Sequence, residues 1–472
     1  MNMKHTALAA TALLLAAGCS TQPAYQRPAI ELPAQFKEAT AAAAQAGIWR
    51  PAQPQDAAPP EEWWRLYGDP VLDDLQQRAA VANPGIAQAV ARLRAAQAAV
   101  AGSRAALLPT LGASSSATRA RGASTANTAG PVTSYSLGLN AGWEIDLWGR
   151  LSGAASAAEA SAQASGADLA AARLSLQATA AQTYFALRAA EAQGALLRDT
   201  LAAYEQSWQL TRNRERAGVA SPADVAQAEA QYKSTQAQLL EAETSRAQIE
   251  HALAALIGLP PAAFGLDATA RLPAPPEVPA ELPSRLLERR PDIAAAERRV
   301  AAANAQVGVA QSAFFPALTL SAAGGWRGAS LGDLVGAPNL FWSLGPALAL
   351  TLFDGGARSA AVESARASLD LAAAGYRQAV ITALQEVEDN LAAATSLARE
   401  EQVQTEAVAA AQRALTIATN QYKAGTVGYL NVLSAQTTVL SAQRGLIDVK
   451  NRRLAAVNTL LKNVAGRWDG PP

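Results

Sequence analysis

Few residues in this sequence have the types and spacing that chemistry on a substrate requires. The chain of 472 residues holds two histidines, His5 near its start and His251 inside a run of helix-forming residues. Arg290 and Asp292 flank a proline, and a helix starting there would place the acid near the positive end of its dipole. The Asp-Gly-Gly sequence at 354–356 is typical of a tight turn and lacks the pattern of a phosphate loop. We therefore predict that the chain is not an enzyme and holds no cofactor or metal.

The single thiol, Cys19, lies in a context that indicates modification. The apolar run at 6–17 is shorter than the roughly 20 residues of a spanning helix and is typical of a secretory signal. The run ends in Leu-Ala-Ala-Gly-Cys, which resembles a bacterial lipobox with its leucine one position further upstream than usual. We interpret 1–18 as a signal peptide and Cys19 as an acylated N-terminus; the alternative is an ordinary signal peptide with a chance cysteine. Ser20 follows instead of aspartate, and the resemblance then implies sorting to the outer membrane.

Composition limits the class of protein. Basic and acidic residues both number 39, a balance that gives no support for nucleic-acid binding. With one cysteine, no disulfide framework can form within the chain. No segment after the signal has the unbroken apolar length of a transmembrane helix, so a location in lipid would require β-strands.

The chain carries an internal duplication. Turn residues and helix breakers recur 207 positions apart: Pro84 and Pro291, Pro109 and Pro316, Gly149 and Gly356, Gly218 and Gly425, Val225 and Val432, Ala228 and Ala435. This agreement predicts two copies of one structural unit. The predicted organisation is a signal peptide, a lipid-anchored extended arm, a first repeat, a proline-rich linker, a second repeat and a C-terminal tail, at 1–18, 19–61, 62–258, 259–283, 284–466 and 467–472.

Each copy is predicted to begin with a helix and to end in a long helical hairpin, at 150–258 and 358–465. The first helix of each hairpin contains no proline and would reach roughly 100 Å if continuous. A glycine turn and a returning helix follow. Apolar residues at heptad spacing predict a coiled-coil face on the second returning helix, at Leu433, Leu440, Ile447, Leu454 and Leu461. Spacings of three and four predict a packing face on the helix before it, at Leu369, Ala372, Tyr376, Ala379 and Ala383.

Each copy is also predicted to contain a β-hairpin, at 110–148 and 317–353. Apolar residues alternate with polar or small ones throughout 135–147, which is long enough for a tilted membrane strand of about 9–11 residues. Strands are also predicted at 111–121, 318–327 and 342–352, the first of these mainly because its copy is one. The alternative is a soluble two-hairpin sheet on a helical bundle.

Four strands are too few to close a membrane barrel, because the smallest have about eight, so the chain must associate if these strands lie in lipid. With these features the sequence resembles the TolC-like outer-membrane factors, in the lipoprotein branch often called NodT-type. The resemblance is carried by motifs across nearly the whole mature chain: Trp63-Trp64, Asp69-Pro70-Val71-Leu72, Glu144-Ile145-Asp146-Leu147-Trp148-Gly149-Arg150, Arg289-Arg290-Pro291-Asp292-Ile293, Ala296-Glu297, Phe314-Phe315-Pro316 and Leu352-Phe353-Asp354-Gly355-Gly356. It implies a mixed α/β membrane protein: a homotrimer with a shared twelve-stranded outer-membrane β-barrel, continued by a long periplasmic α-helical barrel of coiled coils.

The resemblance also implies a gate near the two helical turns. Tyr422 and Leu430 match positions that build it, with Leu430 at an apolar constriction that would resist wetting; ordinary coiled-coil packing is the alternative for both. Ser434 stands where relatives often carry aspartate, so a cation-selective acidic ring is in doubt, although Asp224 could substitute. The turns match loops that meet a periplasmic adaptor, and their glycines permit close backbone approach: Gly218, Val219, Ala220, Gly425, Thr426, Val427 and Gly428.

The predicted function is the outer-membrane channel of a tripartite, RND-type efflux pump that passes small molecules to the exterior. The implied partners are two further copies of the chain, a periplasmic adaptor (membrane fusion protein), an inner-membrane RND transporter and outer-membrane lipid, without nucleic acid. The implied location is the outer membrane of a Gram-negative bacterium, with a lipid anchor and a periplasmic extension. The alternatives are the outer-membrane channel of a type I protein secretion system and a periplasmic coiled-coil lipoprotein scaffold.

Mass spectrometry of the purified protein tests the assignment of Cys19. We expect a mature chain that begins at Cys19 and carries lipid. The Cys19→Ser substitution should weaken anchoring, while the membrane strands still hold the protein in the membrane. A mature chain that begins elsewhere, or an unmodified Cys19, would contradict the assignment.

Overall fold

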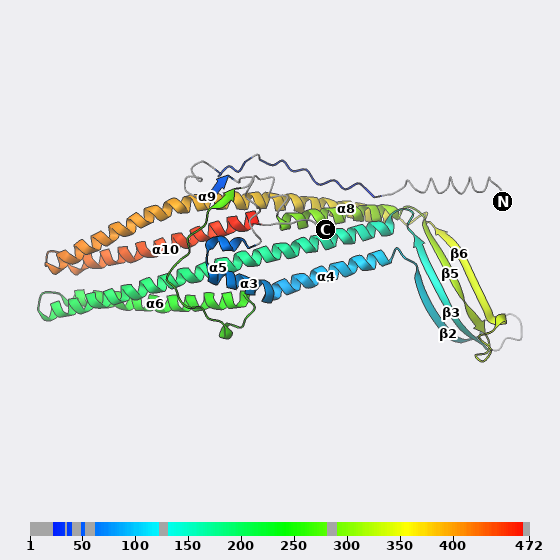
Figure 1. Ribbon diagram of the computed structural model, residues 1–472, viewed down its shortest axis with the longest axis horizontal. Coiled ribbons are helices and arrows are strands. Elements are labelled where there is room, and N and C mark those ends of the chain that lie inside the picture. Colours follow the sequence, from blue (N-terminus) through cyan, green and yellow to red (C-terminus); the bar gives the residue numbers. More distant parts are fainter. Residues whose placement is uncertain are drawn as a thin grey trace. The chain divides into compact units, whose positions relative to one another are not determined.

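The computed structural model describes residues 22–33, 35–39, 49–51, 62–121, 131–280 and 290–465. The predicted signal peptide, Cys19 and the tail at 467–472 lie outside the described residues. Matching helices and strands of the two halves begin 207 positions apart (Figure 1): α4 (Pro84–Ala105) and α8 (Pro291–Ser312), β2 (Thr110–Ala120) and β5 (Ala317–Gly328), α5 (Arg150–Arg216) and α9 (Ala357–Lys423), α6 (Pro222–Leu256) and α10 (Tyr429–Ala465). The remaining elements are β1 (Trp49–Pro51), η1 (Trp63–Tyr67), α3 (Pro70–Ala82), β3 (Val132–Ile145), η2 (Pro261–Ala263), β4 (Val278–Ala280), η3 (Ala337–Asn339) and β6 (Leu340–Ala349).

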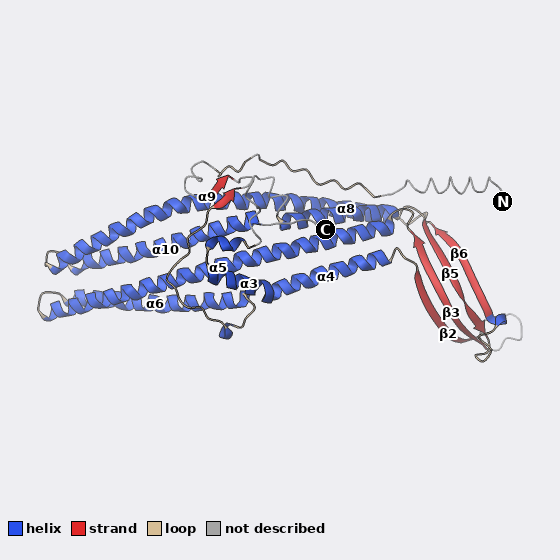
Figure 2. Cartoon of the chain, viewed as in Figure 1, coloured by secondary structure: helices blue, strands red, loops and turns tan. Residues whose placement is uncertain are grey.

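The chain forms two compact units, each built from both halves of the sequence. The first comprises Met1–Ala29, Arg92–Gly166 and Ala295–Arg377 and contains the larger sheet (Figure 2). The second comprises Ile30–Ala91, Ala167–Ala294 and Gln378–Pro472 and contains most of the buried apolar residues. The compact units do not coincide with the predicted repeats, because each repeat contributes residues to both.

The sheet of the first unit has the strand order β2-β3-β5-β6, and all neighbouring strands are antiparallel. Side chains alternate between its two faces, as the period of two predicts. The apolar face carries Leu111, Leu137, Leu139, Trp143, Leu318, Leu320, Trp326, Leu340, Trp342, Leu344 and Leu348; the polar face carries Ser114, Ser116, Ser136, Asn140, Glu144, Thr319, Ser321, Arg327 and Ser343, together with Phe341. The strand predicted with weak alternation, β2, pairs with β3 along its whole length.

Strands β3 and β6 end earlier than predicted, because an aspartate after each strand caps the following helix. β3 ends at Ile145 and β6 at Ala349. Asp146 accepts hydrogen bonds at 3.0 and 2.8 Å from two backbone N–H groups in the first turn of α5. Asp354 accepts two such bonds, at 3.0 and 3.1 Å, around the start of α9. Each carboxylate satisfies donors that a helix start leaves free, so the chain turns instead of extending the strand.

The first described residues of the N-terminal arm pack on helices of the same unit. Gln22 donates a hydrogen bond from Nε2 to the carbonyl of Gly149 at 3.3 Å, beside the start of α5. Glycines make room for this contact, because a Cβ atom at Gly153 would collide with the Gln22 amide and one at Gly308 would lie 3.0 Å from the Gln22 Cα. The chain three residues after Cys19 is thus held at the junction between β3 and α5.

The core of the second unit joins segments that lie far apart in the sequence. Tyr67 of η1 packs on Phe185 of α5, with ring centroids 4.7 Å apart. Asp69 caps α3 by accepting from the backbone N–H of Val71 at 3.0 Å, and its second oxygen accepts from the Tyr184 hydroxyl at 2.6 Å. The Asp-Pro motif of the sequence therefore starts a helix and fixes it to α5 at the same time.

The helix faces predicted from periodicity are confirmed by burial. On α10, Leu440, Leu454 and Leu461 are buried, while Leu433 and Ile447 are half-buried. On α9, Tyr376 and Ala383 are buried and the other three predicted positions are half-buried.

The described part of the proline-rich linker contains two short elements, where the sequence predicts neither a helix nor a central strand. η2 is one turn of 3₁₀ helix that starts at a proline. β4 pairs in parallel with β1 of the arm in a two-stranded sheet. Proline is tolerated in such a pair because both strands are edge strands. Glu191 of α5 fixes the linker by accepting the backbone N–H of Thr269 at 3.0 Å and by pairing with Arg188 at 2.7 Å.

Arg290 and Asp292 form an ion network at the start of α8. The buried Arg290 guanidinium lies 2.7 Å from Asp292 and 3.0 Å from Glu386 of α9. It also donates to the side-chain oxygen of Asn463 of α10 at 3.1 Å. The network joins the start of α8 to the middle of α9 and the last turns of α10, so these residues serve the architecture.

Replacing Arg290 with methionine should destabilise the protein strongly. The carboxylates of Asp292 and Glu386 and the side-chain oxygen of Asn463 would lose their shared partner. Because both carboxylates are partly exposed, we expect a cost of about 1–3 kcal/mol. Arg78→Met is the control, because it removes an exposed ion pair with Asp74 that is worth about 0–1 kcal/mol. Thermal unfolding in detergent should show a large decrease in Tm for Arg290→Met alone. Equal decreases in the two variants would contradict a structural role for the network.

Candidate functional site

The two long hairpins turn through the same backbone motif. Gly218 follows α5 with φ 74°, and the N–H groups of Gly218 and Val219 donate to carbonyls in the last turn of α5 at 2.8 and 2.9 Å. Gly425 follows α9 with φ 77°, and it and Thr426 repeat this pairing at 3.0 Å. This is the Schellman arrangement, in which glycine takes the left-handed conformation just past a helix end. The predicted turns are therefore backbone structures that need these two glycines.

The predicted docking residues are accessible in the described chain. Val219 is an apolar side chain that is 62% exposed at the tip of its turn. Ala220 and Val427 are half-buried, and the other predicted docking residues are exposed. Both turns therefore present backbone and small side chains to a partner.

Asp224, the acid considered as a substitute in the gate, is a helix cap. Its backbone N–H donates to the Ser221 hydroxyl at 3.1 Å, and its carboxylate accepts the Ser221 N–H at 3.1 Å. This reciprocal pair is a capping box at the start of α6. The carboxylate is thus committed to the backbone of its own turn.

The structure does not bring the three predicted gate residues together. Tyr422 is buried and packs edge-on against Tyr429, with ring centroids 5.5 Å apart and Val432 in the same cluster. Leu430 is 63% exposed, and Ser434 is exposed one turn further along the same face of α10. Coiled-coil packing, the alternative weighed for both residues, accounts for Tyr422 within this chain but does not account for Leu430.

Arg214 of α5 also belongs to this region, although it is not among the predicted site residues. Its guanidinium carbon lies 4.8 Å from the centre of the Tyr422 ring, and its Nη1 donates to the carbonyl of Lys423 at 3.3 Å. A cation is favourable there because the last carbonyls of α9 form the negative end of its dipole. Burial raises the pKa of Tyr429 to about 12, and nearby Tyr422 adds to the effect. Gln421 is the repeat counterpart of Arg214, so the duplication did not indicate this contact. The sequence feature that could have indicated it is a basic residue in the last turn of a helix.

Ser434 lines a shallow groove between α9 and α10. The groove is bordered by hydroxyl, amide and methyl groups, from Gln404, Ser434, Thr437, Thr438, Ser441 and Ala442. The Thr437 and Thr438 hydroxyls each donate to a carbonyl of the preceding turn, at 2.9 Å. This face of α10 is therefore polar and uncharged.

The part of the chain that the structure describes contains neither a cluster of metal-ligating side chains nor a helix that could span a membrane. No three His, Cys, Asp or Glu side chains gather there as a potential metal site. None of the helices in that part combines the length and the apolarity needed to cross a membrane.

A family model described as outer membrane efflux protein matches residues 75–259 and 282–466. The chain belongs to the outer membrane efflux protein family. The two matches begin 207 positions apart, which is the offset of the duplication. The family consists of transport components of the outer membrane, so this chain is an outer-membrane channel subunit for efflux.

Individual relatives match over nearly the full length of the chain. The probable efflux pump outer membrane protein TtgC of Pseudomonas putida is 33% identical over 480 residues, with 99% of this chain and 96% of TtgC covered. The pyoverdine export outer membrane protein OpmQ of Pseudomonas aeruginosa is 34% identical over 482 residues, with 99% and 98% covered. The solved outer-membrane channel OprN has a TM-score of 0.87 at 29% identity, with 95% of this chain and 99% of that chain covered. The predicted fold class, a duplicated mixed α/β protomer of a trimeric outer-membrane channel, is confirmed by these likenesses.

Substitutions at Leu430 and Tyr422 separate a gate from helix packing. Leu430→Ala should raise the conductance of the trimer in a planar bilayer, because a smaller side chain weakens an apolar constriction. The protomer should keep its stability within about 0.5 kcal/mol, since the replaced side chain is exposed. Tyr422→Ala should instead cost about 3–5 kcal/mol. Unchanged conductance with lowered stability in Leu430→Ala would contradict the gate.

Charge selectivity is tested at the next position of the same helix face. Ser434→Asp should shift ion preference toward cations, with less effect on opening, because it adds charge without removing the apolar side chain of Leu430. Reversal potentials under a salt gradient measure the preference. The same reversal potential in the variant and the wild type would place Ser434 away from the ion path.

Proposed function

We propose that this chain forms the exit duct of a tripartite pump: three copies enclose the channel, a periplasmic adaptor meets the hairpin turns, and an inner-membrane RND transporter supplies small molecules. The observation that carries the proposal is the four-stranded sheet with one apolar and one polar face. Its edges, β2 and β6, each present one row of backbone groups without a partner in the sheet. In lipid each unpaired group costs several kcal/mol, so the edges must pair with other copies of the chain.

The number of copies follows from the strands that each copy contributes. Two copies would give eight strands, and side chains fill the interior of barrels of about that size. Three copies give twelve, which leaves room for cargo. The polar face of the sheet then lines the channel, and the apolar face meets lipid.

Small organic molecules are the cargo class that we propose. Relatives at 33–34% identity carry names that refer to toluene efflux, antibiotic efflux and pyoverdine export. The groove beside Ser434 fits this class, because an uncharged polar lining imposes little selection by charge. Lipidation at Cys19 completes the proposal, since the adjoining arm is held where a membrane strand meets its helix.

The docking role of the turns is tested by Val219→Glu. The side chain is exposed, so the protomer should fold, but a carboxylate buried without a partner in the adaptor interface would cost about 2–5 kcal/mol of binding. We expect dye to accumulate in cells that lack their own outer-membrane channel and express the adaptor, the transporter and the variant. Val81→Glu, at an 89% exposed position of α3, is the matched control and should keep efflux.

Conductance of the same variant decides the interpretation. Val219→Glu should form a channel in a planar bilayer that conducts like the wild type. Wild-type efflux by Val219→Glu would contradict docking at this turn.

A further inference from the structure

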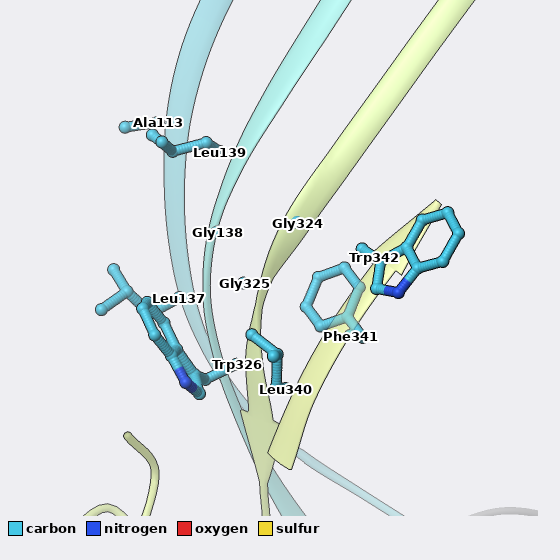
Figure 3. Close-up of a pocket in the computed structure, with 10 residues that line it drawn as sticks. All are labelled: Ala113, Leu137, Gly138, Leu139, Gly324, Gly325, Trp326, Leu340, Phe341 and Trp342. Atoms are coloured by element: carbon cyan, nitrogen blue, oxygen red, sulfur yellow. The ribbon is translucent and has the colours of Figure 1, made fainter. Parts of the chain in front are cut away.

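The apolar face of the sheet contains a notch of about 560 Å³ at Gly324 of β5 (Figure 3). Leu139 and Trp326 border it on one side, and Leu340 and Trp342 border it on the other. Gly324 supplies the floor without a side chain. The notch is therefore an apolar depression, with the rings of Trp326 and Trp342 on opposite sides of it.

Strand pairing does not require glycine at this position. A Cβ atom on Gly324 would lie 3.7 Å from the Phe341 carbonyl oxygen, which is ordinary contact. At the adjacent Gly325, by contrast, a Cβ atom would collide with the carbonyl of Leu137, so glycine is needed there. Glycine inside a strand weakens it and often marks a place where a ligand approaches closely. Strand packing thus explains the glycine at 325 but not the glycine at 324.

The notch lies toward the end of the sheet that is remote from the helices. The strands join α4, α5, α8 and α9 through their other ends, near Thr110, Ile145, Ala317 and Ala349. Trp326 and Leu340, which border the notch, pair in the last register position of β5 with β6. Because the helices of the family are periplasmic, this end of the sheet faces the outer leaflet.

A cation lies beyond the notch on the same face. Ala113, Ala117 and Arg119 share the apolar face by alternation along β2. Arg119 pairs with Thr133, four residues past Leu137 of β3, or about 13 Å at 3.3 Å per residue. Its side chain is exposed and has no ion pair among the residues that the structure describes. An apolar notch is thus followed, toward the exterior, by an exposed guanidinium.

We propose that the notch binds one acyl chain of the phosphorylated, multiply acylated glycolipid of the outer leaflet, and that Arg119 binds a phosphate of the same lipid. The proposal rests on the function proposed above, because the apolar face must meet lipid. The notch is continuous with that lipid-facing surface, and an acyl chain over Gly324 would contact the leucine and indole side chains that border it. Arginine is well suited to the headgroup because its planar fork binds phosphate through two parallel hydrogen bonds. A phospholipid of the inner leaflet would not reach this end of the sheet.

Native mass spectrometry of the purified trimer with added hexa-acylated, bisphosphorylated lipid A tests the site. Gly324→Leu should fill the notch and lower the apparent affinity about tenfold. Gly324→Ala, whose Cβ fits in ordinary contact, should give a smaller decrease and serves if the leucine variant does not assemble. Gly345→Leu is the matched control, because it adds the same side chain on the polar face of β6, where nothing lies within 4 Å of the added Cβ.

The headgroup is tested with two further probes. Arg119→Ala should weaken binding of bisphosphorylated lipid A more than binding of its dephosphorylated form. Phosphatidylethanolamine should bind the wild type about tenfold more weakly than lipid A. Equal binding of lipid A by the wild type and both Gly324 variants would overturn the site. Equal affinity for phosphatidylethanolamine and lipid A would overturn the assignment to a phosphorylated glycolipid.

Conductance recorded on the same preparations separates this proposal from the channel function. If the wild type conducts and the Gly324 variants bind lipid A as tightly as the wild type does, the lipid site is refuted and the channel function stands. A wild type that binds lipid A as expected but does not form trimers refutes the proposed channel.

Discussion

Backbone hydrogen bonding in lipid is the constraint on which the rest of this structure depends. Lipid offers no donors or acceptors, so a sheet that enters it cannot keep an unpaired edge. The sheet β2-β3-β5-β6 has two edges, and pairing β6 of one copy with β2 of the next satisfies both. Oligomerisation is then a condition for folding into the membrane. It places the apolar face of the sheet in lipid and the polar face in the aqueous channel. The long alanine-rich helices that follow the strands are brought together by the same assembly.

The duplication supplies two similar hairpins, and their tips have diverged. Both end in a glycine with a left-handed conformation, but only the first turn continues into a Ser221–Asp224 capping box. The counterparts of Tyr422 and Leu430 in the first copy are Glu215 and Ala223, so aromatic and large apolar residues at these positions occur in the second copy only. Arg214 in the first copy binds the helix end of the second. The second copy thus carries the candidate constriction, and Arg214 of the first copy contacts the end of α9 beside it.

Sequence patterns predicted the elements whose stabilising contacts are local or periodic. The long helices, the heptad face of α10 and the alternation of β3 follow from nearest neighbours and repeat spacing. The predicted ends of β3 and β6 were wrong because Asp146 and Asp354 cap the following helices. A hydrophobic pattern does not show that such a cap ends the strand hydrogen bonding. Three features depend on contacts between residues about 200 positions apart: the burial of Tyr422, the role of Arg214 and the pairing of β1 with β4. A single sequence does not show which of such distant residues meet. The identity of the gate residues therefore stayed a prediction.

Cysteine cross-linking between the sheet edges tests the central claim most directly. A chain with Ser343→Cys on β6 and one further cysteine on β2, at Gly112, Ser114 or Ser116, places both thiols on the polar face of the sheet. A disulfide forms only where two Cα atoms lie about 4.4–6.8 Å apart, so one of the three pairs should match the register between copies. Oxidation in the membrane should then give covalent dimers and trimers and no larger species. Folded, membrane-inserted protein that stays monomeric in all three variants would contradict an edge-to-edge barrel of three chains.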